Sequence, residues 1–375
     1  MSDVVTVGLT NGPRHGSHPH GRAAADHATA QPGAASLRHR VADHAASGAL
    51  RDLLAHHRLS YARQPLSEGA VFGLSGALSL SARIARGAIP PIDLEGRAPS
   101  LELELCQHLG VEARWLATDD PARGWQQLRR ELDAGRPVLL RADIGELDYQ
   151  PERPHDTRHV IVVTGCDVQA GIVWVLDRCF PEPQRCTLSS LAAARASRGW
   201  PEPARHGLLR LRVPDALPEA HSAIGAALAR VVQNMRHPPA DGHPHAHSGL
   251  AGIDALAAAW PQLPRLAGPR LAQTLDGLRF RVRDGGTGGA LYRSLQARFE
   301  HDAAALLEAP QLGRAALVCD DLADAWRAFA EATEDDDAER AHRAAGAWVQ
   351  RIRALEHRHV EALEQHLWRE QAARA

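Results

Sequence analysis

Two runs of hydrophobic, mostly β-branched residues lie close together near the middle of the chain, over residues 160–163 and 172–176. The short segment between them contains Asp and Gly, which favour a tight turn. This pattern predicts a β-hairpin over residues 158–178. With the centre of the turn taken near Val168, His159 and Asp177 are expected to lie directly opposite each other. Directly opposed residues on antiparallel strands share a face, so we expect the two side chains to meet.

A helix is predicted before the hairpin, over residues 44–57, because its apolar residues recur at the spacing of one helical face. Asp43 precedes this stripe and is expected to be the N-cap. Residues 44–47 therefore lie on the first helical turn. Backbone N–H groups and the helix dipole favour negative charge there, which suits a thiolate or an oxyanion.

The other elements of the N-terminal half follow from the same periodicities. The segment 67–84 predicts a glycine-containing loop followed by a buried strand or helix. Helices are expected over residues 101–109, 120–134 and 188–196, the last capped by Thr187, and strands over residues 136–143 and 206–213.

After Pro214 the pattern changes to Ala- and Leu-rich stretches with helical periodicity, over residues 219–235, 253–260, 290–307, 312–333 and 339–369. The fold class expected is α+β over residues 37–213, with an antiparallel sheet and an N-terminal helix, followed by an all-helical domain over residues 214–375. Residues 1–36 are rich in Gly, Pro and His without periodicity, and we expect a disordered leader.

A glycine-rich segment, DGGTGG, spans residues 284–289 and immediately precedes one of these helices. Such turns at helix N-termini can bind phosphate. No strand is predicted before this glycine-rich turn, however, and the segment matches neither GxGxxG nor GxxxxGK[ST], the common phosphate-binding patterns. A tight structural turn is therefore the favoured interpretation.

Composition narrows the class of protein. The 44% hydrophobic and 23% charged residues are typical of a soluble globular chain, and the net charge of −2 gives no reason to expect nucleic acid or a membrane as partner. All basic residues are Arg, which excludes a catalytic lysine. No apolar run is long enough to span a membrane and no signal peptide is recognisable. Five cysteines without CxxC spacing argue for reduced thiols in a cytoplasmic protein and against a structural zinc site.

The His159–Asp177 pair has the chemistry of the orienting half of a catalytic triad. A carboxylate can fix the imidazole tautomer, so that the other ring nitrogen acts as a base. The same spacing also fits a surface His–Asp pair on an ordinary hairpin. From the spacing alone both interpretations stay open, because a β-bulge would change the register.

The N-terminal half resembles the N-terminal domain of butirosin biosynthesis protein H, a family with a papain-like, bacteriocin-peptidase-like fold. The matching stretches are HAASGALRDLL, SEGAVFGLSGAL, LDAGRPVLLRAD with a following Tyr149, and the hairpin with His159 and Asp177. The C-terminal half resembles the helical domain of unknown function that often follows it, through GLAGIDALAAAW and GGTGGALYRSLQARFEHDA.

This resemblance implies acyl or aminoacyl transfer from a carrier-protein thioester to an amine. It implies a cysteine nucleophile after His44, a base at His159 and an orienting acid at Asp177. This chain has Ala45 at the nucleophile position. Three explanations are open: Ala45 is an engineered substitution; the natural protein is inactive or promotes direct attack by the amine; or Ser47 is the nucleophile. The third is weakest, because two residues rotate a helical side chain by about 200°.

The motif stretches contain further candidate substrate-binding residues, namely His44, Ser47, Ser67, Glu68 and Tyr149. Glu68 could equally anchor its loop to a backbone amide. Two other function classes stay open: a peptidase or cyclase acting on a peptide precursor, and a binding protein that has lost its chemistry. Ala45 favours the second of these.

The implied partners are an acyl carrier protein, or another acyl thioester donor, and a small-molecule or peptide amine acceptor. The sequence contains no motif for a metal or an organic cofactor, so we expect neither. It leaves the oligomeric state open, including a homo-oligomer.

Overall fold

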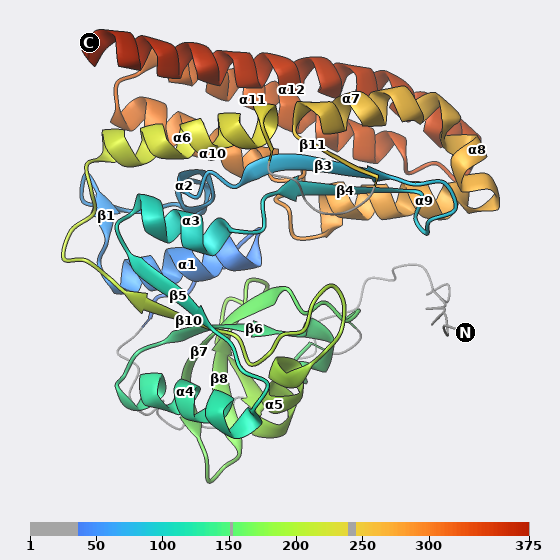
Figure 1. The fold of residues 1–375 in the computed structure, drawn as a ribbon. Coiled ribbons are helices and arrows are strands. Elements are labelled where there is room, and N and C mark those ends of the chain that lie inside the picture. Colours follow the sequence, from blue (N-terminus) through green and yellow to red (C-terminus); the bar gives the residue numbers. More distant parts are fainter. Residues whose placement is uncertain (1–36, 151–152, 239–244, 375) are drawn as a thin grey trace. The chain divides into compact units, whose positions relative to one another are not determined.

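The predicted hairpin forms two strands of a six-stranded antiparallel sheet in the computed structural model of the chain (Figure 1). The structure describes residues 37–150, 153–238 and 245–374. The predicted leader over residues 1–36 lies outside them. In spatial order the sheet contains β5 (Glu112–Leu116), β10 (Leu208–Arg212), β6 (Val138–Ala142), β7 (His159–Asp167), β8 (Ile172–Leu176) and β9 (Gln184–Thr187).

The predicted register of the hairpin was wrong. Near the turn, Asp167 pairs with Ile172, and continuing this register would place Asp177 opposite Val162. A bulge between Val163 and Gly165 shifts the ladder, so that Val162 pairs with Leu176 instead. Continued by one residue beyond the end of β8, the shifted register places Asp177 opposite Ile161. Because side chains alternate along a strand, this shift returns Asp177 to the face of His159.

The helices of the N-terminal half form where the apolar periodicity predicts them, with Thr187 capping the last one as expected. One expectation was incomplete: the first part of segment 67–84 is a helix capped by Ser67, not a loop, and a buried strand follows it. The helices are α1 (Ala45–His56), α2 (Glu68–Leu74), α3 (Leu101–His108), α4 (Pro121–Asp133) and α5 (Leu188–Ala196).

The C-terminal region is largely helical, as predicted. Among the described residues of this region, the one strand is β11 (Ala246–Ser248). It pairs with β3 (Leu78–Ile84), which in turn pairs with β4 (Ile92–Arg97). A separate two-stranded sheet joins β1 (Ser60–Tyr61) and β2 (Gln64–Pro65). The helices are α6 (Ala220–Arg236), α7 (Leu250–Ala259), α8 (Leu263–Ala267), α9 (Leu271–Arg279), α10 (Arg293–Leu306), α11 (Pro310–Ala332) and α12 (Ala338–Arg374).

One hydrophobic core joins the two halves of the chain. It contains Leu50 of α1, Val162 of β7 and Phe72 of α2 together with Phe299 of α10 and Trp326 of α11. A smaller core lies on the other face of the six-stranded sheet, against α4 and α5. Residues of the C-terminal region are therefore packed close to the strands and helices that carry the predicted catalytic residues.

Candidate active site

His159 and Asp177 meet as the sequence predicts. His159 Nε2 lies 2.9 Å from Asp177 Oδ2, and both side chains are buried. Two further donors bind the same carboxylate oxygen: the Tyr149 hydroxyl at 3.0 Å and Gln150 Nε2 at 2.6 Å. His159 Nδ1 forms no hydrogen bond with any of the described residues. The carboxylate thus holds one nitrogen of the ring and leaves the other free to act as a base.

The surroundings of Asp177 favour its ionised form. Burial by itself would raise the pKa of this carboxyl, but the charge of His159 and the hydrogen bonds from His159, Tyr149 and Gln150 outweigh burial and lower the pKa below its ordinary value. For Tyr149, burial and then the neighbouring Asp177 raise the pKa well above its ordinary value, so its hydroxyl remains a donor. Tyr149, predicted as a candidate for substrate contact, donates its hydroxyl to Asp177.

The N-terminus of α1 is capped differently from the prediction. The helix begins at Ala45, so His44 is the N-cap, and its Nδ1 accepts a hydrogen bond from the Ser47 amide at 3.4 Å. The prediction of Asp43 as the N-cap was wrong: Asp43 precedes the N-cap by one residue, and its carboxylate pairs with Arg298 of α10. Burial, then the charges of Arg97, Arg178 and His159, lower the pKa of His44 well below its ordinary value, which keeps this imidazole neutral.

Glu68 anchors the segment that leads into α1. Its carboxylate accepts hydrogen bonds from the backbone amides of His44 at 2.8 Å and Asp43 at 3.1 Å. This is the anchoring role that the sequence left open beside substrate contact. The amides of Ala45 and Ala46, by contrast, bind no acceptor among the described residues. Two N–H groups of the first helical turn therefore remain available for an oxyanion.

Ala45 and His159 line the same cavity, which has a volume of about 210 Å³. The predicted nucleophile position and the predicted base thus face a common space. His44 lines it as well. Ser47 does not: its side chain is fully buried and its Oγ lies 2.9 Å from His44 Nδ1. Ser67 lies elsewhere, lining a separate cavity where its Oγ donates to Asp302 at 2.8 Å.

The C-terminal region supplies the opposite wall, which the sequence did not reveal. The turn at residues 284–287 and Tyr292 line the cavity. The Tyr292 ring packs edge-on against His44, with ring centroids 5.2 Å apart, and stacks on Phe72 at 5.3 Å. Gly286 has a φ of +72°, and a Cβ there would lie 3.2 Å from the Arg178 guanidinium. The glycine-rich segment is thus a tight turn, and it also forms part of the cavity.

The cavity is rich in positive charge. More arginines than carboxylates line it: Arg97, Arg153, Arg158, Arg178 and Arg281 against Glu95, Asp156 and Asp284. Arg158 and Arg281 are paired with Glu95. Arg97 and Arg178 form no ion pair with any carboxylate of the described residues. They leave positive charge available to an anionic group of a ligand.

Comparison with known protein families identifies both halves of the chain. Residues 44–178 match the family described as butirosin biosynthesis protein H, N-terminal. The chain carries this family's N-terminal domain. Residues 189–363 match a second family, described as a domain of unknown function (DUF4872). Among curated proteins, none matches the chain.

The first match confirms the resemblance drawn from the sequence. The butirosin-type domain is papain-like and belongs to an acyltransferase-like family of aminoglycoside biosynthesis. It extends from His44 to Arg178 and so contains Ala45, His159 and Asp177, whereas the turn at residues 284–287 and Tyr292 fall within the second match. Across the described residues, no helix is long and apolar enough to cross a membrane.

Proposed function

We propose that the chain transfers an acyl or aminoacyl group from a thioester, such as that of an acyl carrier protein, to an amine acceptor. The observation that carries this proposal is the imidazole of His159, which is held by Asp177 and lines the same cavity as Ala45, the first residue of α1. The available arginines, Arg97 and Arg178, suit a donor with an anionic group.

The transfer requires a base and a place for developing negative charge. His159 Nδ1 takes a proton from the acceptor amine, whose nitrogen attacks the thioester carbonyl carbon. The amides of Ala45 and Ala46 donate to the carbonyl oxygen as it becomes an oxyanion. The carbon–sulfur bond then breaks, and the leaving thiolate takes the proton from His159. Because Ala45 has no nucleophilic atom, the acyl group passes directly from donor to acceptor.

An Ala45→Cys variant tests whether this cavity is an acyl-transfer site. A cysteine there would have the base and the helix N-terminus that activate a thiolate. Intact mass spectrometry with a panel of acyl thioesters should show one acyl adduct on Ala45→Cys and none on the unchanged chain. Ala49→Cys, one turn further along α1, is the matched control for unspecific acylation. A folded Ala45→Cys protein that gains no adduct, or gains it no faster than Ala49→Cys, would contradict the proposal.

A second candidate function is binding without turnover, which the alanine at the nucleophile position favours. The two are separated by incubating the unchanged chain with a thioester and an amine and measuring the amide product. Direct transfer predicts product that disappears in His159→Ala. A binding protein predicts retained thioester and no product above the uncatalysed rate.

A further inference from the structure

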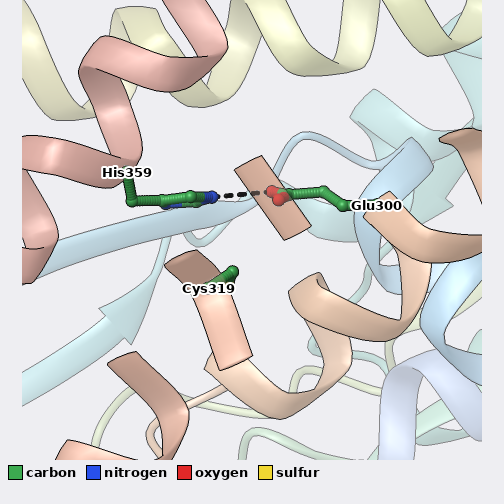
Figure 2. A group of neighbouring side chains, drawn as sticks. All are labelled: Glu300, Cys319 and His359. Carbon is green, nitrogen blue, oxygen red and sulfur yellow. Dashed lines mark hydrogen bonds and ion pairs between the residues drawn. The ribbon is translucent and has the colours of Figure 1, made fainter. Parts of the chain in front are cut away.

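Three side chains from three helices meet in the core of the C-terminal region, away from the cavity. Glu300 lies on α10, Cys319 on α11 and His359 on α12, and all three have no exposed surface. Figure 2 shows the carboxylate of Glu300 and the ring of His359 facing each other, with Cys319 close by. Each residue offers one ligand atom, and the three atoms lie within 4.8 Å of one another.

The hydrogen bonds within this cluster leave several polar atoms unsatisfied. His359 Nε2 and Gln296 Nε2 each lie 2.8 Å from the same oxygen, Glu300 Oε1. Glu300 Oε2, His359 Nδ1 and Gln296 Oε1 are buried and have no hydrogen-bond partner among the described residues. A buried polar atom without a hydrogen-bond partner destabilises the folded protein. Several of them beside a buried thiol point to a ligand that the protein would hold there.

We propose that Glu300, Cys319 and His359 bind a divalent transition-metal ion, with zinc as the best match. Thiolate, imidazole and carboxylate are the ligands that zinc prefers, whereas magnesium and calcium select oxygen ligands alone. Bonds of about 2.0–2.3 Å place the ligand atoms of a tetrahedral site roughly 3.3–3.8 Å apart. This separation is below the 4.8 Å within which the three ligand atoms lie. Gln296 lies one helical turn before Glu300 and faces it with Nε2; rotation of this amide would offer its unpartnered oxygen as a fourth ligand.

The charges of the core fit such an ion. A zinc ion with one thiolate and one carboxylate is neutral as a unit. The neighbouring buried charges, Arg293 and Glu356, already form an ion pair with nitrogen and oxygen 2.8 Å apart. Metal binding would therefore leave no uncompensated charge in this core, where one would be expensive.

The site has a structural role in this proposal. It would tie together α10, α11 and α12, and α10 follows directly on Tyr292, which packs against His44 at the cavity. The sequence argued against zinc because no two cysteines have short spacing. The ligands come instead from positions far apart in the chain, and only the packing of three helices brings them together.

The first test measures metal in the purified full chain. After exposure to zinc and dialysis, elemental analysis should find one tightly held zinc per chain, lost in Cys319→Ala. Cys106→Ala removes another buried thiol that has no part in this cluster, and it should keep the metal. Equal metal content in the two variants would assign the zinc to other residues, such as the exposed histidines, and overturn the proposal.

The main arm of the second test uses the unchanged chain and therefore does not depend on a variant folding. Cobalt(II) bound by a thiolate absorbs in the near ultraviolet, so cobalt added to the metal-free, folded chain should produce this band at one equivalent. Glu300→Gln should shift or weaken it. A folded chain that binds neither zinc nor cobalt, or that binds cobalt without thiolate absorption, would show that the cluster is a hydrogen-bonded core only.

Discussion

At the scale of single residues, the proposed mechanism requires Asp177 to keep His159 oriented and in one tautomer. Asp177→Asn in the Ala45→Cys background replaces the carboxylate with an amide of the same shape. Because an amide can present its N–H to the ring, it can select the wrong tautomer, and we expect acyl-adduct formation to slow by about 10³–10⁴-fold. Intact mass spectrometry of samples quenched at successive times measures this rate. Tyr149→Phe, which removes one donor to the same oxygen, should slow it far less, and a similar loss in both would refute the orienting role.

The lowered pKa of Asp177 also predicts how stability depends on pH. The unfolded chain takes up this proton first as pH falls, since an unperturbed Asp titrates near 3.8. The stabilisation is therefore complete above that value and is lost as pH falls through the lower pKa of the folded state. In Asp177→Asn, the unfolding free energy should fall less steeply below pH ~4, by up to about 1.4 kcal/mol per pH unit. Denaturant titrations across this range measure the slope, and identical slopes would contradict the assignment.

At the scale of elements, the sequence predicted the hairpin and its functional pair but not the register that joins them. Periodicity locates strands well, because alternation follows from burial of one face. The bulge at Thr164 leaves no such signal, because it inserts one residue without a partner on the neighbouring strand and no residue type marks that insertion. The prediction of contact between His159 and Asp177 was therefore correct, although the reason given for it was wrong.

The same limit explains the misplaced cap of α1. Asp43 is the better N-cap by residue type, but Glu68 binds the amide of Asp43 and Arg298 binds its carboxylate. Both partners are distant in sequence. Helix and capping propensities do not include tertiary contacts of this kind, and these contacts decide where the helix begins.

The turn before α10 gives a prediction at the scale of one element. Gly286 and Gly289 both have positive φ, at +72° and +78°, so alanine at either costs about 1–2 kcal/mol. Only at Gly286 would the new methyl meet Arg178, whereas nothing lies within 4 Å of the corresponding position at Gly289. In the Ala45→Cys background, Gly286→Ala should therefore slow acyl loading, while Gly289→Ala should lose only stability. Equal loading by the two variants would exclude a contribution of this turn to the site.

At the scale of the whole molecule, the sequence divided the chain at residues 213/214 but could not show that the two parts share a hydrophobic core and a cavity. Periodicity identifies elements and the change from mixed to helical structure, yet it carries no information on which faces meet. In the structure, the described residues all belong to one compact unit. The wall of the cavity built by Tyr292 follows from that packing, which is why sequence motifs alone assigned the site entirely to the N-terminal half.

Arg293 makes the coupling of the two parts testable. Its buried guanidinium donates to the carbonyls of Ser79 on β3 and Gly96 on β4, and it pairs with Glu356 on α12. Arg293→Met would leave Glu356 buried without its partner and should lower the unfolding free energy by about 3–5 kcal/mol. Because the guanidinium joins both halves, hydrogen exchange should show β3, β4 and the C-terminal helices losing protection together. Arg353→Met, which breaks a half-exposed pair with Asp254, should cost at most about 1 kcal/mol. Loss of protection confined to the C-terminal helices in Arg293→Met would mean that the two parts unfold independently.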